Sequence, residues 1–293
     1  MVIRIGVTLA LMLMGRGLMG QELTADTGVH LVSRQFGFTE GASVDKRGNV
    51  FFTDQPNNRI WEYDTHGRLS VFLDSAGRSN GMYFDRSGRL VTCADEHSQL
   101  WAIGPDKKVE VLLKEVGGKQ LNGPNDLWID ARGGIYFTDP YYQRPYWTRT
   151  KGEIDGERVY YLAPGATEAR VAAADVVKPN GIVGTPDGRF LYVADIGAGK
   201  TYKYRIGMDG SLSDRRLFVM QGSDGMTLDV RGDVYLTGDG VTIYDTAGTK
   251  IGHIAVPEPW TANLCFGSRD KKTLFITASQ GLYEIRMRVR GVE

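Results

Sequence analysis

A hairpin pattern recurs six times along this chain, and it constrains the fold more than any other feature of the sequence. In the most complete copy, at residues 121–139, Asn125 precedes an alternating apolar strand, a glycine-rich turn follows at 131–134, and a second apolar strand ends on Asp139. The residues that open the copies lie 40, 45, 55, 44 and 39 positions apart, and they are Glu40, Asn80, Asn125, Asn180, Asp224 and Asn263. A repeat of about 40–45 residues is typical of the four-stranded blades of a β-propeller.

The spacing therefore predicts an all-β fold, a six-bladed β-propeller with one four-stranded sheet in each blade. In the first copy the two outer strands are expected at residues 60–63 and 69–73. The sixth copy has only a third strand, at 282–286, whereas the alternating segment 29–36 precedes the first copy and belongs to no blade. We predict that this N-terminal strand closes the last blade, because closure removes exposed sheet edges and ties the chain ends together.

The composition agrees with a single domain of many short strands. The chain has 293 residues and 38 glycines, nearly twice the average glycine usage of about 7%, as tight turns between strands require. Its 35 lysines and arginines balance its 35 aspartates and glutamates. Because the sequence has neither a basic excess nor a basic run, we expect no nucleic-acid partner and no membrane partner once the signal is cleaved.

Residues 1–20 stand apart from the repeats. Arg4 supplies a positive charge ahead of an almost wholly apolar stretch at 5–14, and a polar stretch follows at 21–27. This arrangement resembles a secretory signal peptide, since the apolar core is too short to span a bilayer of about 30 Å. We predict cleavage after Gly20, export to the periplasm or the medium, and a single propeller domain at 21–293. The alternative is a retained N-terminal anchor.

The two cysteines, Cys93 and Cys265, fall in strands of the second and sixth copies. Those blades are not neighbours in a six-bladed ring, and a disulfide requires Cα atoms within about 7 Å of each other. We therefore expect two buried free thiols.

One connection is much longer than the others. Residues 140–157 separate the second and third strands of the third copy, and they hold four aromatic side chains, Tyr141, Tyr142, Tyr146 and Trp147. The segment is either a surface loop packed on its own aromatic rings or a lid over one mouth of the central channel, since long loops on a rigid scaffold often carry function.

The six opening residues are expected to form a ring at one mouth of the propeller axis, because first strands line the axis and run in the same direction. Every member offers a side-chain oxygen and none is basic. Such a ring suits calcium, which takes about 6–8 oxygen ligands, and Glu40 with Asp224 would balance one divalent cation. The absence of histidine and cysteine from the ring disfavours zinc. Alternatively, these Asn-Gly and Asp-Gly pairs serve only as turns.

Five aspartates end the second strands of their copies, at Asp54, Asp95, Asp139, Asp195 and Asp239. We expect most of them to accept hydrogen bonds from backbone amides of the adjoining loop. Asp139 is the expected exception, because it precedes the long aromatic segment, and we assign it a contact with substrate.

Four stretches of the sequence resemble the regucalcin, gluconolactonase and luciferin-regenerating-enzyme-like family. They are TEGASVD around Glu40, GKQLNGPNDLWIDARGGIYFTDP around Asn125, KPNGIVGTPDGRFLYVAD around Asn180, and GSDGMTLDVRGDVYLT around Asp224. The resemblance covers roughly residues 36–286. It implies a six-bladed propeller with one catalytic divalent cation, usually calcium, and ligands at Glu40, Asn180 and Asp224. Many members hydrolyse sugar lactones and some hydrolyse organophosphates. Gly123 stands where regucalcin-type members have an arginine that touches substrate.

These observations predict a calcium-dependent hydrolase of a small-molecule lactone. The metal would be held by Glu40, Asn125, Asn180 and Asp224, and it would polarise the ester carbonyl. Asp224 is the candidate base, although a metal-bound water acting alone is equally possible, and Asn125 either ligates the cation or orients substrate. No G-x-S-x-G motif indicates a nucleophilic serine. The alternatives are a phosphotriester hydrolase on the same site and a non-enzymatic ligand-binding propeller with a structural calcium.

Overall fold

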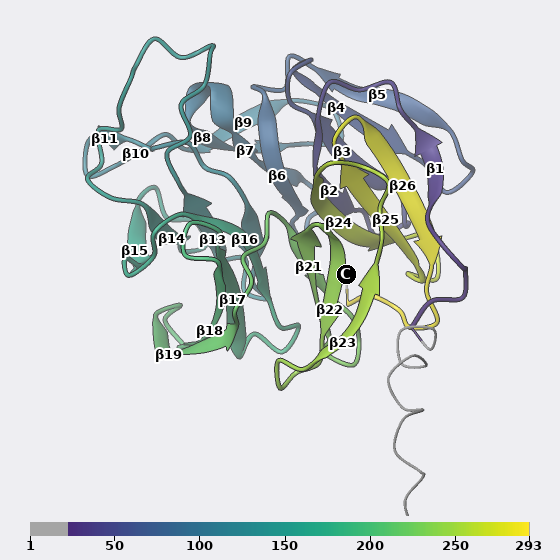
Figure 1. Cartoon of the computed structure of the whole chain (residues 1–293). Coiled ribbons are helices and arrows are strands. Elements are labelled where there is room, and N and C mark those ends of the chain that lie inside the picture. The colour runs from purple at the N-terminus through teal and green to yellow at the C-terminus, as the bar shows by residue number, and fades with distance from the viewer. Residues whose placement is uncertain (1–22, 293) are drawn as a thin grey trace, which may run out of the picture.

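The computed structural model describes residues 23–292, and in this part of the chain the strands form six four-stranded antiparallel sheets and one two-stranded hairpin. The predicted signal peptide at 1–20 lies outside the described residues. The sheets succeed one another around a common axis as the blades of a six-bladed β-propeller, which confirms the predicted fold class (Figure 1). No helix within residues 23–292 is long and apolar enough to cross a membrane.

The first three blades follow the chain in order, each running from its inner to its outer strand. Blade one contains β2 (Thr39–Val44), β3 (Val50–Asp54), β4 (Arg59–Tyr63) and β5 (Leu69–Asp74). Blade two contains β6 (Ser79–Phe84), β7 (Leu90–Ala94), β8 (Gln99–Ile103) and β9 (Val109–Leu113). Blade three contains β12 (Leu127–Ile129), β13 (Ile135–Asp139), β14 (Arg158–Leu162) and β15 (Ala169–Ala173).

The last three blades repeat this order, and the sixth takes its outer strand from the other end of the chain. Blade four contains β16 (Pro179–Gly184), β17 (Phe190–Asp195), β18 (Lys200–Ile206) and β19 (Leu212–Val219). Blade five contains β20 (Met226–Leu228), β21 (Val234–Gly238), β22 (Gly240–Tyr244) and β23 (Lys250–Ile254). Blade six contains β24 (Thr261–Gly267), β25 (Thr273–Ala278), β26 (Gly281–Arg286) and β1 (His30–Ser33).

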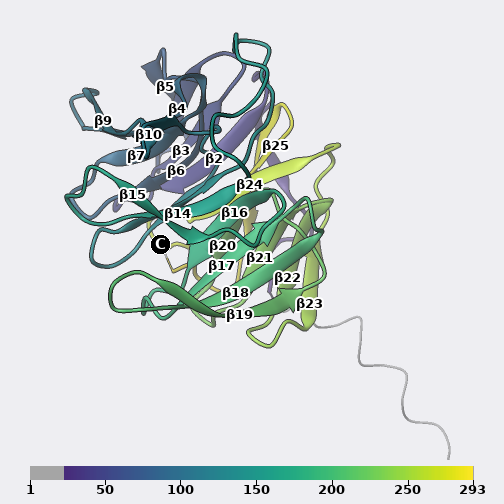
Figure 2. The same cartoon turned by 90° about the vertical axis from the view of Figure 1, so that its left-hand side faces the viewer.

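Three short elements lie outside the blades: the 3-10 helix η1 (Asp95–His97) and the hairpin of β10 (Glu115–Val116) with β11 (Lys119–Gln120). In Figure 2 the first strands gather near the centre of the molecule, whereas outer strands such as β9, β19 and β23 lie at its periphery. Apolar clusters fill the spaces between blades. In one of them Val193 of β17 packs with Leu236 of β21, and both side chains are fully buried.

The N-terminal strand closes the ring as predicted. β1 pairs antiparallel with β26, with His30 opposite Glu284, and the two lie side by side in Figure 1. Beyond β1, Phe36 is buried with its ring centroid 5.0 Å from that of Phe52 and 5.3 Å from that of Trp61. Leu23 is also buried, within the apolar cluster of blades five and six. The first described residues therefore contribute core packing as well as edge pairing.

In blades one, two, three and five, the inner hairpin turn is stabilised by an aspartate that lies three residues before a glycine. In blade one, Asp45 Oδ1 accepts hydrogen bonds from the amides of Arg47 at 2.8 Å and Asn49 at 2.9 Å, and Gly48 adopts a φ of 93°. Asp130 bonds the amides of Arg132 and Gly134 in the same way in blade three. In these copies of the repeat, the aspartate and the backbone amides that stabilise the turn belong to the same short segment of sequence.

The glycines that follow the opening residues have another role, since they bring neighbouring first strands into contact. A Cβ at Gly41 would lie 2.1 Å from the carbonyl oxygen of Asn80, and a Cβ at Gly181 would lie 2.4 Å from that of Asp224. Threonine hydroxyls of the second strands join the same positions, as Thr138 Oγ1 donates to the carbonyl of Asn180 at 2.8 Å. The Asn-Gly and Asp-Gly pairs are therefore contacts between blades, and they hold the opening residues around the axis.

Cys93 and Cys265 are both buried and free, which confirms the prediction of two free thiols.

Candidate active site

Five of the six opening residues line one cavity of about 250 Å³ at a mouth of the propeller axis; they are Glu40, Asn80, Asn125, Asn180 and Asp224. They come from the first strands, or the residues just before them, in blades one to five. The other lining residues are Phe38, Gln55, Tyr142, Arg144, Ile196 and Trp260. All four predicted metal ligands are thus brought together.

The sixth opening residue, Asn263, does not line the cavity and instead contacts Glu40, which does. Its Nδ2 donates to Glu40 Oε2 at 3.3 Å, and its Oδ1 accepts a hydrogen bond from the amide of Leu264 at 2.8 Å. Because both ends of this carboxamide are engaged, Asn263 holds the Glu40 carboxylate in place instead of facing a ligand.

The two carboxylates of the cavity are close enough to affect each other's ionisation. Burial, together with the charge of Asp224, raises the pKa of Glu40 well above its ordinary value. Burial also raises the pKa of Asp224. Two carboxylates that share a buried site resist ionising together unless a positive charge lies between them. This pair therefore fits a divalent cation.

Two amide oxygens at the cavity have no hydrogen-bond partner among the described residues. They are Asn80 Oδ1 and Asn180 Oδ1, and both side chains are buried. Buried polar atoms without a partner are rare in proteins and call for an explanation, such as an ion or an ordered water. Carboxylate and amide oxygens are the donors that calcium prefers, so the residues present suit this ion.

A second layer of side chains orients these donors. Asn180 Nδ2 donates to the hydroxyl of Tyr142 at 3.3 Å, which leaves Asn180 Oδ1 as the free end of the amide. Trp260 Nε1 donates to Asp224 Oδ2 at 2.6 Å, and the amide of Gly41 donates to Glu40 Oε2 at 2.7 Å. Outer contacts of this kind fix the orientation and the charge of metal ligands.

No group of three or more His, Cys, Asp or Glu side chains within residues 23–292 is arranged to hold a metal. The opening residues at this mouth supply two carboxylates and three amides.

Asp139, which the sequence assigned to substrate, does not line the cavity. It is fully buried, and its carboxylate accepts hydrogen bonds from the amides of Asn122 and Gly123, each at 2.9 Å. Burial raises its pKa to about 7. Asp54 and Asp195 bond loop amides in the same manner, so Asp139 follows the general behaviour expected of the blade-ending aspartates. Asp139 is therefore not among the residues that could contact a substrate in this cavity.

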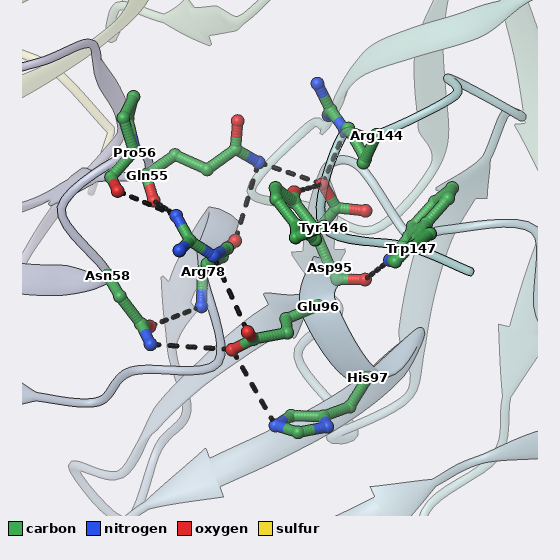
Figure 3. A network of polar contacts seen from close by, with 10 residues as sticks. All are labelled: Gln55, Pro56, Asn58, Arg78, Asp95, Glu96, His97, Arg144, Tyr146 and Trp147. Carbon is green, nitrogen blue, oxygen red and sulfur yellow. Dashed lines mark hydrogen bonds and ion pairs between the residues drawn. The ribbon is translucent and has the colours of Figure 1, made fainter.

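Asp95, at the start of η1, differs from Asp54, Asp139 and Asp195 in the partners of its carboxylate. Its Oδ2 accepts hydrogen bonds from Tyr146 at 2.7 Å and Gln55 at 3.0 Å, and it lies 2.7 Å from Nε of Arg144 (Figure 3). Trp147 Nε1 donates to the Asp95 carbonyl at 3.2 Å. Asp95 thus anchors the 140–157 segment of blade three onto blade two.

The long segment contributes to the cavity wall through Tyr142 and Arg144, so it has the position that the lid interpretation predicted. Gly123 permits this arrangement, because a Cβ there would lie 2.7 Å from the Trp147 ring. No repeat or motif of the sequence marks Gln55, Arg144 or Trp260 as a site residue. The only sequence signal for Arg144 was its place among the aromatic residues of an unusually long connection.

A six-bladed propeller with oxygen donors converging at one mouth of its axis is the class of protein that the geometry defines. The chain belongs to the SMP-30/gluconolactonase/LRE-like family, whose profile matches residues 38–280, and the resemblance noted in the sequence is thereby confirmed.

Among curated proteins, the chain is 27% identical to a gluconolactonase of Zymomonas mobilis over 92% of this chain and 84% of that one. Among solved structures, it is 28% identical to a gluconolactonase of Xanthomonas campestris, with a TM-score of 0.84 and 91% of each chain covered. The calcium-binding regucalcin of Agrobacterium tumefaciens superposes with a TM-score of 0.75 at 18% identity, over 90% of this chain and 95% of that one. The similarity to regucalcin, at this level of identity, shows that the two chains share a fold.

Proposed function

We propose that this protein hydrolyses sugar-type lactones with the help of one calcium ion held by Glu40, Asn125, Asn180 and Asp224. The main support is the convergence of these residues at one mouth, with Asn180 Oδ1 buried and unpartnered. Two family members similar to this chain over most of its length are named gluconolactonase. We add Asn80 as a fifth oxygen donor, because its Oδ1 is also buried without a partner among the described residues.

When bound, the cation supplies Lewis acidity at the lactone carbonyl. Asp224 takes a proton from the attacking water and so acts as the general base. The water oxygen bonds to the carbonyl carbon, the ring C–O bond breaks, and Asp224 returns the proton to the departing ring oxygen. Trp260 keeps the second Asp224 oxygen in place during these transfers. Asn125 presents its amide to the cavity and orients the substrate.

A screen with and without metal tests this function. The purified protein is offered lactones and phosphotriesters in excess chelator and then in excess calcium. We expect lactone hydrolysis to vanish in chelator and to return with calcium, because the cavity carboxylates need a cation to act. Full activity in chelator, with metal content confirmed near zero, would contradict the metal mechanism. Hydrolysis of phosphotriesters alone would change the substrate class, and calcium binding without any hydrolysis would favour a binding protein.

Substitution of Asn80 tests the fifth donor through calcium affinity, which is measured by calorimetry without any substrate. Asn80→Leu removes an oxygen from the cavity and should weaken calcium binding by roughly tenfold or more, whereas Asn80→Asp adds a charge and should strengthen it. The opposite signs separate a donor from a residue that only fills space. If both variants change the affinity in the same direction, or neither changes it, Asn80 does not face the cation.

A further inference from the structure

We propose that Arg144 makes the cavity selective for lactones that carry an anionic group, either a carboxylate or a phosphate. This inference rests on the lactonase function proposed above, and it assigns that site a substrate class and a specificity-determining residue.

Arg144 is held in place from two sides. Its Nε lies 2.7 Å from Asp95 Oδ2 (Figure 3). Its guanidinium carbon lies 5.6 Å from the centre of the Tyr142 ring. The side chain is 23% exposed. A planar guanidinium fixed in this way loses little further freedom when it binds a ligand.

The outer end of the guanidinium remains available. Among the described residues, the ion pair with Asp95 uses Nε, and no hydrogen bond from either terminal nitrogen of Arg144 to a protein acceptor is formed. Arg144 is also the one basic side chain among the residues that line the cavity. Two parallel N–H donors on a guanidinium match the two oxygens of a carboxylate or phosphate.

Once the cation is bound, no carboxylate of the cavity remains to pair with the terminal nitrogens of Arg144. A divalent ion balances Glu40 and Asp224, the two carboxylates that line the cavity. Arg144 lines the same cavity as these two carboxylates. Asp95 pairs with Nε of Arg144 and does not itself line the cavity, so no protein carboxylate inside the cavity other than Glu40 and Asp224 is available to the guanidinium.

Anchoring of the 140–157 segment does not depend on Arg144 alone. Tyr146 and Trp147 both donate to Asp95, and Arg149 Nη1 donates to the carbonyl of Leu121 at 2.8 Å. Anchoring of the segment therefore does not explain why the charge of Arg144 lies at the cavity wall. Tyr146 shares the Asp95 carboxylate but does not line the cavity, so it serves as the matched control.

The test measures kcat and KM of the calcium-loaded protein for three lactones: glucono-1,5-lactone, its 6-phosphate, and a monolactone of glucaric acid. We expect the parent to prefer at least one anionic lactone by roughly tenfold or more in kcat/KM. Arg144→Gln should reduce this ratio by roughly 10–100-fold, mainly through KM, since a hydrogen bond to a charged group is worth about 1.5–3 kcal/mol. Arg144→Lys should restore part of the preference because it keeps the charge. Tyr146→Phe should retain the preference of the parent.

Two results would overturn the proposal. A parent without any preference for the anionic lactones would do so, and so would an unchanged ratio in Arg144→Gln. A parent that hydrolyses no lactone contradicts the proposed function instead, and Arg144 is then judged by binding. Calorimetry with 6-phosphogluconate, the ring-opened product, should show binding to the calcium-loaded parent that is weaker by roughly tenfold or more in Arg144→Gln. Equal binding to both proteins rejects the assignment.

Discussion

Asp224→Asn should lose lactone hydrolysis by at least the roughly 10²–10⁴-fold that a general base contributes. The substitution keeps an oxygen at the cavity, and that oxygen can still accept the 2.6 Å hydrogen bond from Trp260 Nε1. It removes one of the two carboxylate charges and the proton acceptor. Calcium affinity should fall as well, because Glu40 is then the one carboxylate among the proposed ligands. The rate is therefore measured at saturating calcium, with the bound metal determined in the same sample.

Asn180→Asp is the matched control, because it alters the other side of the same cavity in the opposite direction. The added charge should maintain or raise calcium affinity, and the Tyr142 hydroxyl, which now accepts from Asn180 Nδ2, can rotate to donate to the new carboxylate. A third carboxylate lowers the Lewis acidity of the cation, so turnover should fall without loss of metal. The two variants thus separate catalysis from metal binding.

An Asp224→Asn protein that is fully loaded with calcium and turns over lactone like the parent would show that Asp224 is not the base. Attack by water without a protein base would then be preferred. Asp139 is a poor substitute, since both of its oxygens accept hydrogen bonds from backbone amides and it does not line the cavity.

Removal of residues through Phe36 should destabilise the protein by about 5 kcal/mol or more. The deletion takes away Phe36 and Leu23, which are both buried, and loss of a buried Phe or Leu side chain costs about 2–5 kcal/mol each. It also leaves β26 without its partner β1 and so creates an exposed sheet edge. Since total stabilities are typically about 5–15 kcal/mol, the melting temperature should fall by roughly 10 °C or more.

The matched control removes residues through Gln21, close to the start that we propose for the mature chain, and keeps both Leu23 and Phe36. Its melting temperature should equal that of the mature protein. Equal melting temperatures for the long and the short deletion would mean that β1 and Phe36 add nothing to stability, and that blade six holds without its fourth strand.

Much of the architecture could be predicted because it depends on local patterns. The six copies of the repeat determine the number of blades, and a turn aspartate finds its hydrogen-bonding partners within a few residues, as Asp45 does with Arg47 and Asn49. The strand without a blade at 29–36 indicated the closure by β1, since a propeller edge needs a partner. The four predicted ligands meet at one mouth because equivalent positions of first strands must do so in any such ring.

Other features depend on contacts between residues far apart in the sequence. Asn263 and Asn80 hold equivalent positions in the repeat, yet Asn263 turns to Glu40, 223 residues away, while Asn80 keeps a free oxygen at the cavity. Asp95 and Asp139 end equivalent strands, and only the packing of the 140–157 segment across blade two draws Asp95 to Arg144 and Tyr146. A repeat makes its members alike in backbone position. Which member faces a ligand is decided by neighbours that are not repeated, and those neighbours are brought together only when the ring closes.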